Sequence, residues 1–257
     1  MPPAAKAAEL ARRVRRGDQG AVSRALSLVV NEAPEAAALN RLFFPASGSV
    51  QKIGFFGPPG AGKSTLVGRV ISHYRNQGVK IGVLAVDPSS HVSGGAFLGD
   101  RLRIQEHATD PGVFIRSLAS RGMVGGLSHT IFGAVHALEA FGCGRILLET
   151  VGTGQDEVEV SRVADTVAYV TTPQMGDEIQ AMKAGAMEIA DCFVVNKADL
   201  GGRDKAVADL KSALGLASEA RPRAWTQPIL ATSALLGDGV GELGAALDAH
   251  WEHLRRS

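Results

Sequence analysis

Short apolar runs recur along the chain, and segments with a helical repeat of apolar residues separate most of them. The apolar runs fall at 53–56, 80–86, 113–115, 145–148, 167–172, 193–195 and 229–231. Helical patterns fall near 66–74, 127–141, 178–190, 203–214 and 240–255. Because strands that alternate with helices form parallel sheets, this order predicts an α/β fold in which helices cover both faces of a mostly parallel sheet.

Residues 1–46 precede the first apolar run and have a helical pattern of their own. Leu10 and Val14 would share one face of a helix. Four arginines between residues 12 and 16 form a basic cluster. We interpret this cluster as a solvated helix face in preference to a site for nucleic acid or an acidic partner. The sequence therefore predicts an N-terminal helical extension at 1–46 and an α/β domain at 47–257.

A glycine-rich loop at 57–64 has the sequence GPPGAGKS, which fits the phosphate-loop pattern G-x-x-x-x-G-K-[ST] at every fixed position. Its glycines allow backbone N–H groups to wrap a phosphate at a helix N-terminus. Lys63 would reach the β- and γ-phosphates of a nucleoside triphosphate, and the Ser64 hydroxyl would bind Mg²⁺. The predicted nucleotide contacts here are Gly57, Pro59, Gly60, Ala61, Gly62, Lys63, Ser64 and Thr65.

Two later segments, each following an apolar run, indicate that the base is guanine. The first is Asn196-Lys197-Ala198-Asp199, which has the N-K-x-D pattern of GTPases. The Asp199 carboxylate can accept hydrogen bonds from guanine N1–H and the 2-amino group, a donor pair that adenine lacks. The second is the sequence TSAL at 232–235, which resembles the loop that supports guanine in GTPases. The predicted base contacts are Asn196, Lys197, Asp199, Ser233, Ala234 and Leu235, and we expect GTP and GDP as ligands in preference to ATP.

Two carboxylates are expected at strand ends beside the phosphate loop. Asp87 and Glu149 each follow an apolar run directly. Mg²⁺ takes hard oxygen ligands and few protein carboxylates, so both side chains suit a magnesium site together with Ser64. A helix N-cap or a surface turn is the alternative for either carboxylate. Asp100, in the glycine-bearing loop 88–106, is a further candidate for a metal or switch carboxylate.

The residues after Glu149 read Thr150-Val151-Gly152 and occupy the place of a switch loop. The Gly152 N–H would sense the γ-phosphate, and loss of that phosphate would release the loop. Gln155 would either position the attacking water or be a plain surface glutamine.

Charge and cysteine content exclude other classes of function. The formal net charge is +1, which favours neither nucleic acid nor a membrane surface as a partner. The two cysteines, Cys143 and Cys192, form no CxxC pair, so we expect reduced thiols in a cytoplasmic protein. No apolar stretch approaches the ~20 residues that span a bilayer, and no signal peptide is evident.

Taken together, the motifs are similar to those of the MeaB/ArgK family over roughly residues 10–250. They are GPPGAGKST, AVDPSS, GGAFLGDR, ETVGTGQDE, GDEIQAMKAGAMEIAD, VVNKADL and TSAL, in that order. Members of this family are P-loop GTPases that act as chaperones of adenosylcobalamin-dependent acyl-CoA mutases, of which methylmalonyl-CoA mutase is the best known. The resemblance places the magnesium carboxylates on Asp87, Asp100 and Glu149.

The resemblance also implies a partner-sensing segment at 173–183, which matches the family's mobile loop, often called switch III. Asp177, Glu178 and Lys183 would respond to the mutase, and Lys183 would help to activate GTP hydrolysis. The catalytic set implied is Lys63, Glu149, Gln155 and Lys183. The start of an amphipathic helix is the alternative for this segment, and the two interpretations are compatible because a loop can precede a helix.

By this resemblance the chain would be a slow GTPase that gates adenosylcobalamin loading and protects or reactivates the mutase, with the cobalamin bound to the mutase. A homodimer stays open, because the C-terminal arm through which longer members dimerise is not matched. Three alternatives remain. They are a metal-delivery GTPase of the hydrogenase or urease maturation type, a P-loop kinase, and a nucleotide-dependent binding module without catalysis. A metal-delivery GTPase needs a Cys/His cluster. A P-loop kinase usually needs adenine specificity, which the Asp199 carboxylate disfavours.

Overall fold

The computed structural model describes residues 2–46, 48–87, 105–119, 126–150, 158, 160–174, 186–220 and 224–256. Within these residues, seven parallel strands form one sheet in the order β3-β2-β4-β1-β5-β6-β7. The strands are β1 (Gln51–Phe56), β2 (Ile81–Asp87), β3 (Val113–Ala119), β4 (Arg145–Thr150), β5 (Thr166–Thr171), β6 (Cys192–Val195) and β7 (Ile229–Ala231). The predicted α/β fold with a parallel sheet is confirmed.

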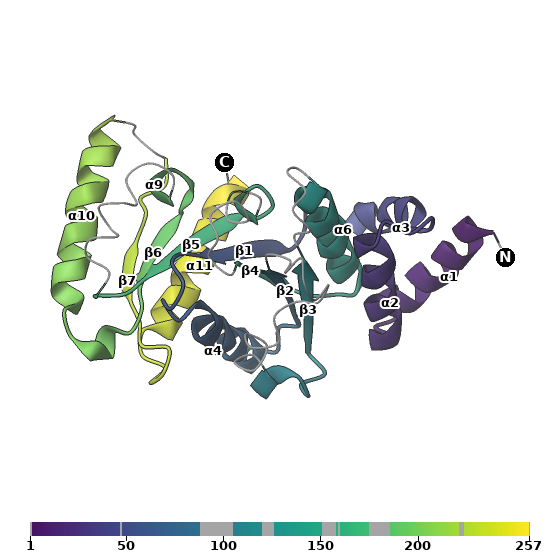
Figure 1. Ribbon diagram of the computed structural model, residues 1–257, viewed down its shortest axis with the longest axis horizontal. Helices are drawn as coiled ribbons and strands as arrows, with labels where there is room; N and C mark the ends of the chain where they lie inside the picture. The colour runs from purple at the N-terminus through teal and green to yellow at the C-terminus, as the bar shows by residue number, and fades with distance from the viewer. Residues whose placement is uncertain are drawn as a thin grey trace, which may run out of the picture.

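Helices cover both faces of this sheet, as parallel strands require. The α-helices of the described residues are α1 (Pro3–Arg15), α2 (Gln19–Val30), α3 (Ala36–Phe43), α4 (Lys63–Asn76), α6 (Gly126–Ala140), α9 (Ala186–Ile189), α10 (Arg203–Ala220) and α11 (Val240–Arg256). Short 3-10 turns are η1 (Phe44–Ala46), η2 (Gln105–His107) and η3 (Ala198–Leu200). In Figure 1, α2 and α3 lie beside α6, α1 lies beyond them, and α10 lies at the opposite end of the molecule.

Alternate residues of each strand enter different cores, because successive side chains of a strand point to opposite faces. In β1, Ile53 and Phe55 pack into a core that α4 and α11 complete. Phe56 faces the other side, where α10 contributes Ala206 and Leu210. A strand buried on both faces reads as a continuous apolar run, which explains why these strands were visible in the sequence.

The N-terminal helices share a core with α6 and with the sheet face beneath it. Leu10 and Val14, which were predicted to share a face of a helix, are both buried in this core. The arginine cluster makes local contacts, since Arg13 pairs with Asp18 at 2.7 Å and Arg15 donates to the Leu42 carbonyl oxygen. The division of the chain at residues 46 and 47 stays a prediction.

Two elements differ in extent from their sequence patterns. The run predicted at 113–115 is the start of β3, which continues to Ala119 and pairs with β2 over its whole length. Arg116 and Ser117 interrupt the apolar pattern, so the second half of this strand did not read as one. Of the helix predicted at 178–190, the described part is α9. In the described part of the chain, no helix combines the length and apolar character needed to cross a membrane.

The buried carboxyl group of Glu139 in α6 provides a test of how α6 packs against the sheet. Its Oε1 accepts a hydrogen bond from the Gly48 N–H at 3.1 Å, while Oε2 has no partner among the described residues. Burial raises the pKa of this carboxyl, and the hydrogen bond from Gly48 and the nearby Lys52 charge offset part of the effect. The folded protein therefore binds this proton more tightly than the unfolded chain, so stability falls as pH rises from the ordinary glutamate pKa through the raised one.

We expect Glu139→Gln to stabilise the protein at pH 8 by on the order of 1 kcal/mol, because an amide can be buried without charge. At pH 4 the advantage should be small, since wild-type Glu139 is then protonated. Urea denaturation of both proteins at the two pH values measures this. A difference in unfolding free energy that is the same at pH 4 and pH 8 would contradict the assignment of a buried, charged Glu139.

Candidate functional site

The phosphate loop connects β1 to α4 at the carboxyl edge of the sheet, where ligands of open parallel sheets bind. Two of its glycines are fixed by close approach. Gly57 has a φ of +136°, and a Cβ there would overlap the carbonyl oxygen of Val170 in β5. Gly62 has a φ of +86°, and a Cβ there would lie 2.5 Å from Nδ2 of Asn196. Larger residues at either position would push the loop away from its neighbours.

Lys63 is the first residue of α4, and its side chain folds back over the loop that precedes it. The ammonium is buried and donates to the carbonyl oxygens of Gly57 at 2.7 Å and Pro58 at 2.9 Å. These bonds hold a positive charge beside the loop at the N-terminus of a helix, where backbone N–H groups also lack helical partners. The arrangement is suited to binding an anion such as a polyphosphate.

Ser64 and Glu149 form a buried pair next to Lys63. The Ser64 hydroxyl donates to Glu149 Oε1 at 2.5 Å, and both residues are less than a tenth exposed. Glu149 lies in β4 opposite Phe55 of β1, which places it beside the phosphate loop as predicted. A hydroxyl and a carboxylate in contact are hard oxygen donors of the kind that Mg²⁺ takes, so these two residues fit a magnesium site.

Asp87 ends β2, the neighbour of β4 in the sheet. The structure describes its backbone, which pairs with Ala119 of β3, and not its side chain. Predicted site residues that lie outside the described residues are Asp100, Gly152, Gln155, Asp177, Glu178 and Lys183. In the described ranges, no group of three or more His, Cys, Asp or Glu side chains is placed to hold a metal ion.

The Asn196 side chain brings the two predicted base segments to the phosphate loop. Its Nδ2 donates to the Ala61 carbonyl oxygen at 2.9 Å. Its Oδ1 accepts from the Thr232 hydroxyl at 3.2 Å and from the Ala234 N–H at 3.0 Å. One buried amide therefore joins the loop after β1, the turn after β6 and the loop after β7. The Thr232 hydroxyl was not among the predicted contacts.

The turn after β6 places the other residues of the N-K-x-D motif near the same edge. Lys197 adopts a left-handed backbone with φ of +57°, and its Cε would lie 3.7 Å from a Cβ on Gly62. Asp199 follows in η3 and is exposed at the surface. A left-handed backbone conformation costs a non-glycine residue roughly 1–2 kcal/mol. Here it turns the chain so that Lys197 lies along the phosphate loop.

The loop after β7 is held mainly through its backbone. Ser233 and Ala234 are buried, whereas the side chains of Leu235 and Leu236 are exposed by 72% and 63%. The Ser233 N–H donates to the Asp238 carbonyl oxygen at 3.0 Å, and the Gly237 N–H donates to the Ser233 carbonyl oxygen at 2.7 Å. We refer to residues 232–236 as the base loop.

Arg69 of α4 is the contact to the base loop that sequence reasoning missed. Its Nε donates to the Ala234 carbonyl oxygen at 2.8 Å, and its Nη2 donates to the Leu235 carbonyl oxygen at 2.9 Å. The partners are backbone atoms, so no residue type in the base loop reveals the contact. The signal available in the sequence was an arginine six positions after Lys63 on the same helix.

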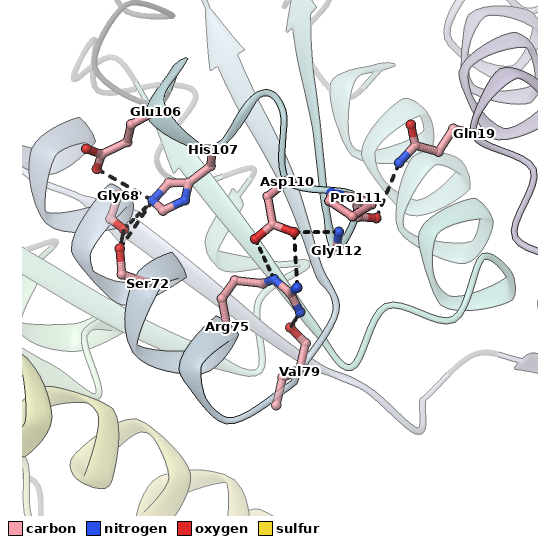
Figure 2. Close-up of polar contacts among 10 residues, drawn as sticks. All are labelled: Gln19, Gly68, Ser72, Arg75, Val79, Glu106, His107, Asp110, Pro111 and Gly112. Atoms are coloured by element: carbon pink, nitrogen blue, oxygen red, sulfur yellow. Dashed lines mark hydrogen bonds and ion pairs between the residues drawn. The ribbon is translucent and has the colours of Figure 1, made fainter.

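A second set of contacts joins α4 to residues 105–112, which precede β3 (Figure 2). Nε2 of His107 lies 3.0 Å from the Gly68 carbonyl oxygen and 3.3 Å from the Ser72 hydroxyl. Arg75 donates to both carboxylate oxygens of Asp110, at 2.9 and 3.0 Å. This pairing and the Gly112 N–H hold the pKa of Asp110 below its usual range. The segment that precedes β3 is therefore fastened to the helix that begins at the phosphate loop.

Comparisons with known proteins agree with this geometry. A family model described as methylmalonyl-CoA mutase-associated GTPase MeaB matches residues 22–257. A protein of Pyrococcus abyssi described as a GTPase is 47% identical over 250 residues, covering 97% of this chain and 77% of that protein. The GTPase ArgK of Escherichia coli is 36% identical over 248 residues, covering 93% and 74%.

Solved structures show the same likeness. The crystal structure of a protein described as an LAO/AO transport system kinase has a TM-score of 0.79 and 30% identity, covering 98% of this chain and 77% of that one. The hydrogenase maturation factor HypB of Archaeoglobus fulgidus, at a TM-score of 0.57 and 19% identity, shares the fold. Family model, relatives and phosphate-loop geometry lead to one conclusion, which is that this chain belongs to the MeaB family of P-loop GTPases.

Proposed function

We propose that this protein is a GTP- and Mg²⁺-dependent chaperone of an adenosylcobalamin-dependent acyl-CoA mutase, with the cobalamin held by the mutase. The observation that carries the mutase role is the match of residues 22–257 to a family described by its association with methylmalonyl-CoA mutase. We further propose that the protein works in the cytoplasm, that it gates cofactor loading, and that it protects or reactivates its partner.

The described residues support guanine nucleotide binding from both ends of the ligand. The phosphate loop and the Lys63 ammonium would bind the β- and γ-phosphates. Asn196 holds the base loop and the N-K-x-D turn at a fixed distance from that loop, so Asp199 would meet the base. An adenine base would leave the Asp199 carboxylate without its donor pair, which disfavours ATP.

Ser64 and Glu149 are the described residues that would hold Mg²⁺, with Asp87 and Asp100 as the further ligands proposed from the sequence. The ion would supply neutralisation of negative charge on the phosphate oxygens. Glu149 accepts the hydrogen bond from the Ser64 hydroxyl, so it fixes the direction of that hydroxyl's proton. Lys63 contributes a second positive charge at the same place.

The sheet order supports coupling between the nucleotide and a partner. β4 and β5 flank β1, and β2 lies next to β4. The segments proposed to sense the γ-phosphate or the mutase follow these three strands, at 88–106, 149–157 and 173–183. The strands that lead into these segments, β2, β4 and β5, therefore end at the edge of the sheet that carries the phosphate loop. Because coupling between two binding sites is reciprocal, a mutase that senses the nucleotide state must in turn change nucleotide affinity.

A metal-delivery function of the HypB type has less support. That likeness is at 19% identity and concerns the fold.

The proposed recognition of guanine by Asp199 provides the first test of this function. Asp199→Asn should lower GDP affinity by about tenfold or more and raise affinity for xanthosine diphosphate, because the amide can donate to the 2-oxo group of xanthine. Isothermal titration with both nucleotides in the presence of Mg²⁺ measures the change. Asp204→Asn, on an exposed aspartate that pairs with Arg203, is the matched control and should leave both affinities as they were. An Asp199→Asn protein that keeps the wild-type preference for guanine would contradict the base assignment.

The partner role is tested by phosphate release with and without a purified adenosylcobalamin-dependent acyl-CoA mutase. The mutase should accelerate GTP hydrolysis by the wild-type protein, and Lys183→Ala should bring the ratio of stimulated to basal rate close to one. Lys205→Ala, on an exposed position of α10, serves as the matched control. Absence of any stimulation of the wild type would reject the mutase as the partner. Equal stimulation of the Lys183→Ala protein would remove Lys183 from the coupling.

A further inference from the structure

Arg69 joins the helix that begins at the phosphates to the loop that lies beside the base. It is half-buried on α4, six residues after Lys63. Its guanidinium makes two hydrogen bonds in one plane, from Nε to the Ala234 carbonyl oxygen and from Nη2 to the Leu235 carbonyl oxygen. A planar fork with two donors fixes two successive carbonyl groups at once, which a lysine ammonium cannot do with the same geometry.

Besides Arg69, the Ser233 hydroxyl helps to fix this stretch of the base loop, because it accepts a hydrogen bond from the Leu236 N–H at 3.3 Å. The Leu235 and Leu236 side chains are mostly exposed, so apolar packing contributes little. The Ala234 N–H is held by Asn196, and the Ser233 N–H is held by Asp238. Arg69 acts on the next two peptide groups, those between residues 234 and 236. Ala234 is therefore held on its N–H side by Asn196 and on its carbonyl side by Arg69.

Because a peptide group is planar, a contact that holds its carbonyl oxygen also fixes the direction of its N–H. A carbonyl oxygen and the N–H of the following residue point in opposite directions within one rigid plane. By holding the Ala234 carbonyl oxygen, Arg69 also sets the direction of the Leu235 N–H. A backbone N–H at the edge of a base pocket can donate a hydrogen bond to a purine that has an oxygen at position 6. It disfavours a purine with an amino group there, because that amino group is itself a donor.

We propose that Arg69 is a positioning residue for base recognition, which orients the Leu235 N–H toward the 6-oxo group of the purine. This inference rests on the proposed guanine nucleotide function. It divides base recognition into two parts: Asp199 reads N1–H and the 2-amino group, whereas Arg69, acting through the base loop, selects for the oxygen at position 6. The two parts have different signatures, because inosine nucleotides share the 6-oxo group with guanine and lack the 2-amino group.

The test measures the dissociation constants of GDP, IDP and ADP, with Mg²⁺, for the full chain and its variants by competition against a fluorescent guanine nucleotide. Arg69→Met keeps the apolar stem and removes the guanidinium. It should weaken GDP and IDP by the same factor, about tenfold, and leave ADP unchanged, so that the preference for GDP over IDP is kept and the preference over ADP falls. Arg69→Lys should show a smaller loss of the same kind, because the ammonium keeps a donor nitrogen and loses the two-nitrogen fork.

Arg75→Met is the matched control, since it removes an arginine from the same helix that contacts Asp110 and not the base loop (Figure 2). It should change none of the three affinities relative to one another. Equal weakening of GDP, IDP and ADP by Arg69→Met, or unchanged affinities, would overturn the proposal for Arg69 while wild-type preference for guanine stands. A wild-type protein that binds ADP as tightly as GDP would instead refute guanine recognition itself, and this inference with it.

Discussion

The site depends on one buried side-chain amide, that of Asn196. Its nitrogen is bonded to the phosphate loop and its oxygen to the loop after β7, while its own backbone continues β6. A buried amide that lost these partners would leave polar atoms without hydrogen bonds, at a cost of about 1–3 kcal/mol for each group. The three loops therefore have one favourable arrangement, and the distance between the phosphate loop and the base loop is set by contacts within the protein itself.

Helix α4 extends this arrangement across the domain. Its first residues meet the phosphate loop, Arg69 meets the base loop, and Ser72 and Arg75 meet the segment that leads into β3. Its apolar face, with Leu66, Val70 and Tyr74, packs into the core shared with α11. Because a packed helix moves as a rigid body, a displacement at its phosphate end would be felt at both of the other contacts. The helix is thus suited to relate nucleotide state to the chain segments that follow β2.

The sequence predicted the parts of this structure that depend on backbone geometry at fixed spacing. The phosphate loop needs glycines where φ is positive or where another chain passes closely, and Gly57 and Gly62 meet those needs. The strands were predictable because burial on both faces leaves a continuous apolar run, while the polar residues Arg116 and Ser117 hid the second half of β3. The arrangement of Glu149 beside Ser64 followed from the rule that parallel strands bring their carboxyl ends together.

Contacts to backbone atoms could not be predicted in this way. Arg69 bonds two carbonyl oxygens, and every residue has a carbonyl oxygen, so neither partner is visible in the sequence. The same applies to the Gly68 carbonyl oxygen beside His107. The Thr232 hydroxyl was missed for a different reason. Threonine is common in β-strands, so a threonine at a strand end does not by itself indicate a role in a site.

The claim that Asn196 makes the phosphate loop and the base loop one unit is tested most directly by hydrogen exchange. Magnesium pyrophosphate has no base, so it can touch the phosphate loop alone. If the two loops open together, bound pyrophosphate must slow exchange of the Ala234 amide as well as that of the amides at 57–64, because it stabilises the closed state of both. Slower exchange confined to 57–64, with the Ala234 amide unchanged, would contradict the account.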